Sequence, residues 1–72
     1  MSVVAINALY EKGRSYVQSR NNSQAIATFR ELLNKYPESP VSRKAAAEIG
    51  LLYYQNDDYD RAIEAYKHVI TK

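Results

Sequence analysis

The stretch GRSYVQSRNNSQAIATF, residues 13–29, returns later in the chain as GLLYYQNDDYDRAIEAY, residues 50–66, a shift of 37 positions. At this shift ten of the thirty-five overlapping residues are identical, whereas unrelated sequences of this composition would share about two or three. An internal repeat of this length predicts a repeated architecture before any local pattern is considered. The identical pairs are Ser2/Ser39, Val4/Val41, Ala8/Ala45, Glu11/Glu48, Gly13/Gly50, Tyr16/Tyr53, Gln18/Gln55, Ala25/Ala62, Ile26/Ile63 and Lys35/Lys72.

Each copy of the repeat predicts two helices joined by a polar turn, because small and apolar residues recur every three or four positions. The predicted faces are Ala5, Ala8, Leu9, Gly13 and Tyr16; Ala25, Ile26, Phe29, Leu32, Leu33 and Tyr36; Ala45, Ala46, Ile49, Gly50 and Tyr53; and Tyr59, Ala62, Ile63, Tyr66, Val69 and Ile70. Pro37 should end the second helix, and Ser39-Pro40 supplies an N-cap and a first helical residue for the third. We therefore predict an all-α chain of four antiparallel helices, forming one domain over residues 1–72 with repeats at 2–37 and 39–72.

The strings Leu9…Gly13-x-x-Tyr16…Ala25-x-x-x-Phe29…Pro37 and Ala46…Gly50-x-x-Tyr53…Ala62-x-x-x-Tyr66 resemble the tetratricopeptide repeat pattern. The resemblance implies a right-handed α-solenoid of two helix-turn-helix repeats. Three features depart from the pattern: Ala46 stands where a bulky residue like Leu9 is expected, Lys12 stands where the pattern has Leu, and the period is 37 rather than 34 residues. The long spacing and the YPESP junction, residues 36–40, are similar to repeats of bacterial cell-envelope proteins such as the Tol-Pal system assembly protein and the outer-membrane assembly lipoprotein.

The recurring glycines predict close packing, because glycine inside a helix costs up to about 1 kcal/mol relative to alanine. We expect another helix to approach Gly13 and Gly50 too closely for a Cβ, with large rings filling the wider gaps. The predicted repeat-packing residues are Gly13, Tyr16, Ala25, Phe29, Pro37, Gly50, Tyr53, Ala62 and Tyr66.

Composition and motifs argue against several function classes. The net charge is only +2, there is no cysteine, and no apolar stretch approaches the roughly 18 residues that span a bilayer.

Asp57, Asp58 and Asp60 could form a metal loop, but they fit helix capping better, since the distal Glu of a calcium loop is missing. His68 has no partner ligand or nucleophile at a suitable spacing. We predict no enzyme activity, no cofactor, no metal and no nucleic-acid binding, and leave the compartment open between the bacterial envelope and the cytoplasm.

The resemblance also implies a concave groove lined by the first helix of each repeat. The groove residues are Asn7, Tyr10, Arg14, Val17, Lys44, Ala47, Leu51 and Tyr54. Tyrosine, arginine and aliphatic side chains suit an extended or helical peptide. Tyr10 and Tyr54 could instead be ordinary exposed aromatics, or cover apolar surface of the chain itself. Tyr10 and Arg14 occupy positions where chaperone-tail clamps use Lys and Asn, which disfavours that class of partner.

Two functions remain open from the sequence. In the first, the chain is a protein-interaction scaffold, part of a longer repeat array, because its ends fall near repeat boundaries. In the second, it is a self-assembly element, since solenoid repeats bury apolar surface against their neighbours. Ile63, Tyr66 and Ile70 at one end, with Val4 and Leu9 at the other, are the expected self-association residues, and we favour a closed dimer over an open filament.

Overall fold

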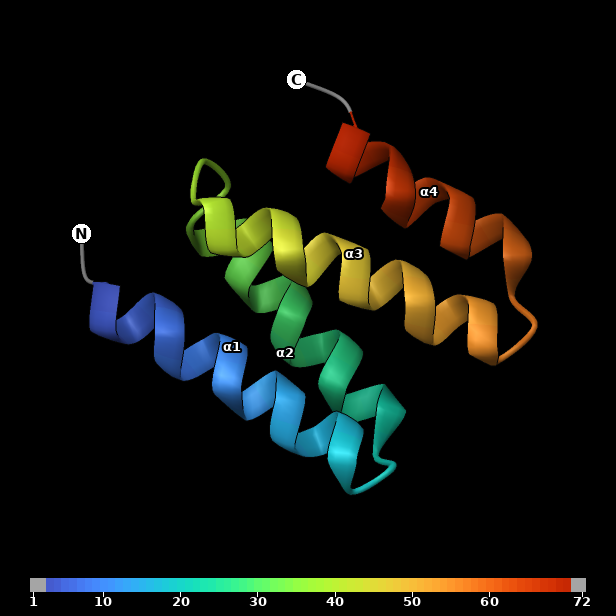
Figure 1. Ribbon diagram of the computed structural model, residues 1–72, viewed down its shortest axis with the longest axis horizontal. Helices are drawn as coiled ribbons and strands as arrows, with labels where there is room; N and C mark the ends of the chain where they lie inside the picture. Colours follow the sequence, from blue (N-terminus) through green and yellow to red (C-terminus); the bar gives the residue numbers. More distant parts are fainter. Residues whose placement is uncertain (1–2, 71–72) are drawn as a thin grey trace.

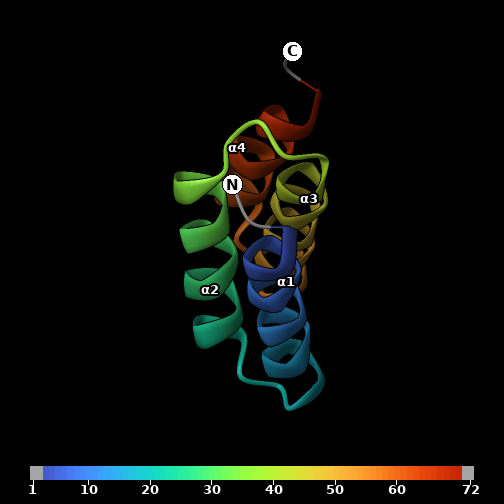
Figure 2. The same cartoon turned by 90° about the vertical axis from the view of Figure 1, so that its left-hand side faces the viewer.

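The computed structural model describes the backbone of residues 3–70 and the side chains of residues 3–67. Over this range it contains four helices and no strand: α1 (Val3–Gln18), α2 (Asn22–Lys35), α3 (Pro40–Gln55) and α4 (Tyr59–Ile70). Consecutive helices run antiparallel (Figure 1), and α2 lies on the opposite side of the molecule from α1 and α3 (Figure 2). The predicted all-α, two-repeat solenoid is confirmed.

The junction between the two helical hairpins is built as the sequence predicts. α2 ends at Lys35, and the chain then passes through Pro37. The Ser39 hydroxyl accepts a hydrogen bond of 3.1 Å from the Val41 N–H, and Pro40 occupies the first turn of α3. Because proline lacks an N–H, it leaves no donor unsatisfied at this position. The Ser42 hydroxyl, fully buried, donates to the Tyr36 carbonyl and ties the start of α3 to the end of α2.

The hydrophobic core lies mainly along α2 and α3. Its buried members are Ile6, Ala25, Phe29, Leu32, Ala45, Ile49, Leu52 and Ala65. On α1 the predicted face is wrong in one respect: Ala8 is exposed, and Ile6 is buried instead. The physical reason lies in the neighbours. Ala45, the repeat equivalent of Ala8, is fully buried because α3 packs against both α2 and α4, whereas α1 packs mainly against α2.

The two glycines sit under aromatic rings rather than under a neighbouring helix backbone. A Cβ built on Gly13 would overlap the ring of Phe29, and one built on Gly50 would lie 2.7 Å from Cε1 of Tyr66. The predicted close approach is therefore confirmed, but its partner differs from our expectation. Because glycine has no Cβ, an aromatic ring can pack directly on the helix backbone at that position. Phe29 fills this space over Gly13, and Tyr66 fills it over Gly50.

The remaining repeat-packing residues support this arrangement. Ala25 and Ala62 are buried, at 0% and 2% exposure. Tyr16 and Tyr53 are half-buried, and Pro37 is exposed in the connection between α2 and α3. On α4 the larger apolar side chains are less covered than their counterparts on α2. Tyr59, Ile63 and Tyr66 are exposed, while the predicted face residues Val69 and Ile70 lie outside the described side chains.

Candidate functional site

The eight predicted groove residues lie on α1 and α3, which share one side of the molecule (Figure 2). Five of them are exposed: Asn7, Arg14, Lys44, Leu51 and Tyr54. The other three, Tyr10, Val17 and Ala47, are half-buried. α1 and α3 thus present a polar and aliphatic surface, but the three half-buried residues also pack within the fold.

Tyr10 belongs both to this surface and to the core. Its ring centroid lies 5.8 Å from that of Phe29, and the side chain packs against the buried cluster. Of the alternatives that the sequence left open, covering of intramolecular apolar surface describes Tyr10. Val17 packs against the same cluster. Mutation of either residue would therefore change stability as well as any surface property.

A polar cluster connects α1 to α3 across this surface. The Tyr10 hydroxyl donates to Oε2 of Glu48 over 3.3 Å, and Nη1 of Arg14 lies 3.8 Å from the same oxygen. The Arg14 guanidinium also lies over the Tyr10 ring, with Cζ 5.9 Å from the centroid. The Tyr10 hydroxyl and, after it, the Glu48 carboxylate raise the pKa of Arg14 above its ordinary value. The Arg14 guanidinium is therefore held beside Tyr10 and paired with the Glu48 carboxylate across the two helices.

Glu48 was missing from the predicted groove. From the sequence, Glu48 stands out only through its match to Glu11 across the repeat. A usable signal was present, because Glu48 follows Lys44 by four positions, and residues at this spacing share one side of a helix. The observed pairing across α1 and α3 holds the Tyr10 ring in place beneath Arg14.

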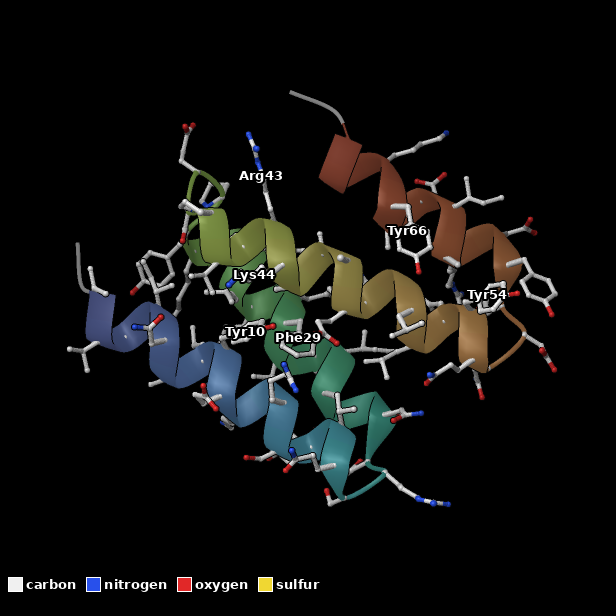
Figure 3. All side chains as sticks on the ribbon, viewed as in Figure 1. Tyr10, Phe29, Arg43, Lys44, Tyr54 and Tyr66 are labelled. Carbon is white, nitrogen blue, oxygen red and sulfur yellow. The ribbon has the colours of Figure 1, made fainter. Side chains whose placement is uncertain are left out.

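The predicted groove residues do not form one continuous cluster. Tyr10 and Lys44 both project into the space between α1 and α3, whereas Tyr54 lies near the far end of α3 beside α4 (Figure 3). The Tyr54 ring meets that of Tyr59 edge-on, with centroids 5.4 Å apart. Leu51, one turn before Tyr54, is 43% exposed. The structure thus places Lys44 near Tyr10 and separates from both an aromatic edge shared with α4.

Two hollows lie away from the predicted groove. The first, of about 750 Å³, is formed by α2, α3 and α4, and the second, of about 550 Å³, lies beside the turns at residues 20–23 and 56–58. None of the eight predicted groove residues lines either hollow. The charged residues of the first are Arg30, Glu38, Arg43, Arg61 and Glu64. Sequence reasoning missed it because it arises where two hairpins meet, which no single helical face encodes.

The acidic turn before α4 performs capping, as predicted. Oδ1 of Asp58 accepts from the Arg61 N–H at 3.4 Å, and its Oδ2 pairs with the Arg61 guanidinium at 3.2 Å. Asp60 lies in the first turn of α4, where the helix dipole favours a negative charge. The equivalent Asn21 precedes α2, but its side chain makes no capping hydrogen bond. His68 lies outside the described side chains.

The turn of each hairpin also shares an uncommon backbone conformation. Arg20 has φ 64° and the equivalent Asp57 has φ 63°, and neither residue is glycine. Each is followed at once by the residue that precedes the next helix, Asn21 or Asp58. In both hairpin turns the equivalent residue adopts the left-handed backbone conformation, so the repeat extends to backbone geometry.

A comparison with protein families agrees with this repeated geometry, since the tetratricopeptide repeat profile matches residues 10–71. The chain belongs to the tetratricopeptide repeat family. No curated protein and no solved structure gave a significant match to it. Tetratricopeptide repeats are non-catalytic and mediate protein–protein interaction. None of the helices in the described part of this tetratricopeptide repeat chain is long and apolar enough to cross a membrane.

Proposed function

We propose that the chain is a protein-interaction scaffold that binds a peptide segment of a partner protein on the surface shared by α1 and α3. The observation that carries this proposal is that Arg14 on α1 and Lys44 and Leu51 on α3 are exposed, while the Tyr10–Glu48 hydrogen bond joins the two helices. Exposed aliphatic and cationic groups beside a rigid aromatic ring suit a peptide that carries apolar residues and a carboxylate. We propose no catalytic role and no cofactor.

Two adjacent cationic residues on α3 provide a matched test of this surface. Lys44 lies on the side of α3 toward α1 and Tyr10, whereas Arg43 points away from α1 (Figure 3) and lines the 750 Å³ hollow. Both are exposed, so replacing either with alanine removes one positive charge without opening the core. The pair therefore separates binding at the α1/α3 surface from binding in the hollow.

The experiment selects peptides from a displayed random library against the 72-residue chain and measures their affinity by fluorescence anisotropy. Lys44→Ala and Arg14→Ala should each weaken binding about fivefold, which corresponds to roughly 1 kcal/mol for a charge at an interface rim. Arg43→Ala should leave the affinity unchanged. If Arg43→Ala weakens binding while Lys44→Ala does not, the peptide occupies the hollow and the proposal is wrong.

A second candidate function, self-assembly, is favoured by a specific observation on α4. Ile63 and Tyr66 are 56% and 38% exposed, and both are large apolar or aromatic side chains. Light scattering over a range of concentrations tests this candidate directly. A homo-oligomer, with a dimer favoured, would support it. A chain that stays monomeric at high micromolar concentration would leave the scaffold as the remaining proposal.

We also propose a bacterial cell-envelope context, which rests only on the similarity of the YPESP junction and the long repeat period to repeats of envelope proteins. In the structure this junction joins α2 to α3 through a proline after one helix and a proline at the start of the next. Fractionation of the source cells, followed by detection with an antibody against the chain, tests the proposal. Recovery of the protein in the cytoplasmic fraction alone would refute it.

A further inference from the structure

The outer sides of α2 and α4 carry equivalent residues in different surroundings. Phe29 on α2 is fully buried, but its equivalent Tyr66 on α4 is 38% exposed. Ile26 is half-buried, and its equivalent Ile63 is 56% exposed. The difference arises because α3 packs against α2, whereas no further helix in the described part of the chain packs beyond α4. An apolar face that is covered in the first repeat is therefore open in the second.

We propose that this open face pairs with the same face of a second copy, with the two α4 helices antiparallel in a closed dimer. Tyr59, Ile63 and Tyr66 follow one another at spacings of four and three residues, which is the spacing of a seam between two packed helices. Tyr54 extends the seam onto α3 through its edge contact with Tyr59. The proposal rests on the second proposed function, self-assembly, and specifies its surface and geometry.

Charge along the edge of the seam selects the antiparallel direction. Asp60 and Lys67 are seven residues apart and so lie on the same flank of α4, about two turns from each other. Both are exposed, and neither forms an ion pair within the described residues. An antiparallel pair centred between Ile63 and Glu64 brings Asp60 of each copy opposite Lys67 of the other. In a parallel pair the same flanks of the two copies would lie on opposite sides of the seam, so Asp60 and Lys67 could not pair with each other.

Head-to-tail stacking is the main structural rival, in which α1 of a second copy would cover α4 as α3 covers α2. The α1 surface is poorly suited to this role. Position 12 holds an exposed lysine, whereas its equivalent on α3 is Ile49, which is 3% exposed within the core. Stacking would bring a charged side chain to a position that α3 fills with an aliphatic one, and burial of an unpaired charge is costly. The α4–α4 arrangement avoids this mismatch.

Charge reversal tests the arrangement, with the dimer dissociation constant measured by sedimentation equilibrium. Asp60→Lys alone and Lys67→Asp alone should each weaken the homodimer about tenfold, because each replaces two attractive contacts by repulsive ones. The double variant Asp60→Lys/Lys67→Asp should restore it. An equimolar mixture of the two single variants should form a heterodimer, since each then meets a complementary partner. Glu11→Lys is the control and should leave the dimer unchanged, since Glu11 is exposed on α1, which does not pack against α4 in the described part of the chain.

Each alternative result has a distinct meaning. A dimer that tolerates both single reversals would overturn the antiparallel geometry while leaving self-assembly intact. Growth into filaments would overturn the closed dimer and support head-to-tail stacking. A wild-type chain that remains monomeric at high micromolar concentration would overturn both this inference and the self-assembly function.

Discussion

The Phe29 ring occupies the space that the Cβ of a side chain at position 13 would fill, which is open only because residue 13 is glycine. The same relationship joins Tyr66 to Gly50. The two rings differ in how freely they can move. Phe29 is fully buried and in contact with Tyr10, whereas Tyr66 is 38% exposed. One glycine position is therefore closed to a methyl group, and the other can accommodate it if the ring moves.

We predict that Gly13→Ala destabilises the chain more than Gly50→Ala. At position 13 overpacking costs about 1–3 kcal/mol, which outweighs the roughly 1 kcal/mol that alanine gains over glycine in a helix. At position 50 the exposed Tyr66 ring can rotate away, so the two effects nearly cancel. Urea unfolding followed by circular dichroism measures both free energies.

The larger variant Gly50→Leu serves as the control, because Tyr66 cannot clear a whole leucine side chain without leaving its site. It should be far more damaging than Gly50→Ala. Equal stabilities of the Gly13→Ala and Gly50→Ala chains would contradict the role assigned to ring mobility.

Ser42 provides a second prediction, since its fully buried hydroxyl donates to the Tyr36 carbonyl at the end of α2. Ser42→Ala should reduce the free energy of unfolding by about 1 kcal/mol, the usual net value of one hydrogen bond. Thermal melts compare it with Ser15→Ala, an exposed position inside α1 where alanine should be neutral or slightly favourable. A Ser42→Ala chain as stable as the wild type would show that the hydrogen bond contributes nothing net.

The capping role of Asp58 predicts a difference between two substitutions. Asp58→Ala removes the acceptor for the Arg61 N–H and should cost about 1 kcal/mol. Asp58→Asn keeps an acceptor oxygen at the same place, so it should retain most of the stability. Chemical denaturation distinguishes the two. If both variants lost equal stability, the ion pair with Arg61 rather than the cap would be the stabilising contact.

The left-handed residues in the hairpin turns predict that glycine helps at one position more than at the other. Arg20→Gly should stabilise the chain by up to about 1 kcal/mol, since glycine adopts positive φ without the strain of a long side chain. Asp57→Gly should gain less, because aspartate tolerates this conformation and its carboxylate accepts a hydrogen bond from Tyr59. Melting temperatures of the two variants test the order. A larger gain at position 57 would contradict it.

The sequence by itself determined the repeat and the helices that follow from it. Gly13 and Gly50, Ala25 and Ala62, and the Ser39-Pro40 start of α3 are local or periodic signals, since helix periodicity and capping depend on residues within a few turns of each other. These signals predicted the helix number, the hairpin turns and the close contact at each glycine.

Only the tertiary structure decided which surfaces those helices cover. Ala8 matches Ala45 in sequence, yet Ala8 is exposed and Ala45 is buried, because α3 has packed helices on two sides. Tyr10 reaches both Phe29 and Glu48, and the 750 Å³ hollow forms only where α2, α3 and α4 meet. Burial depends on the neighbours that a helix acquires, and equivalent residues in a repeat acquire different neighbours at its two ends.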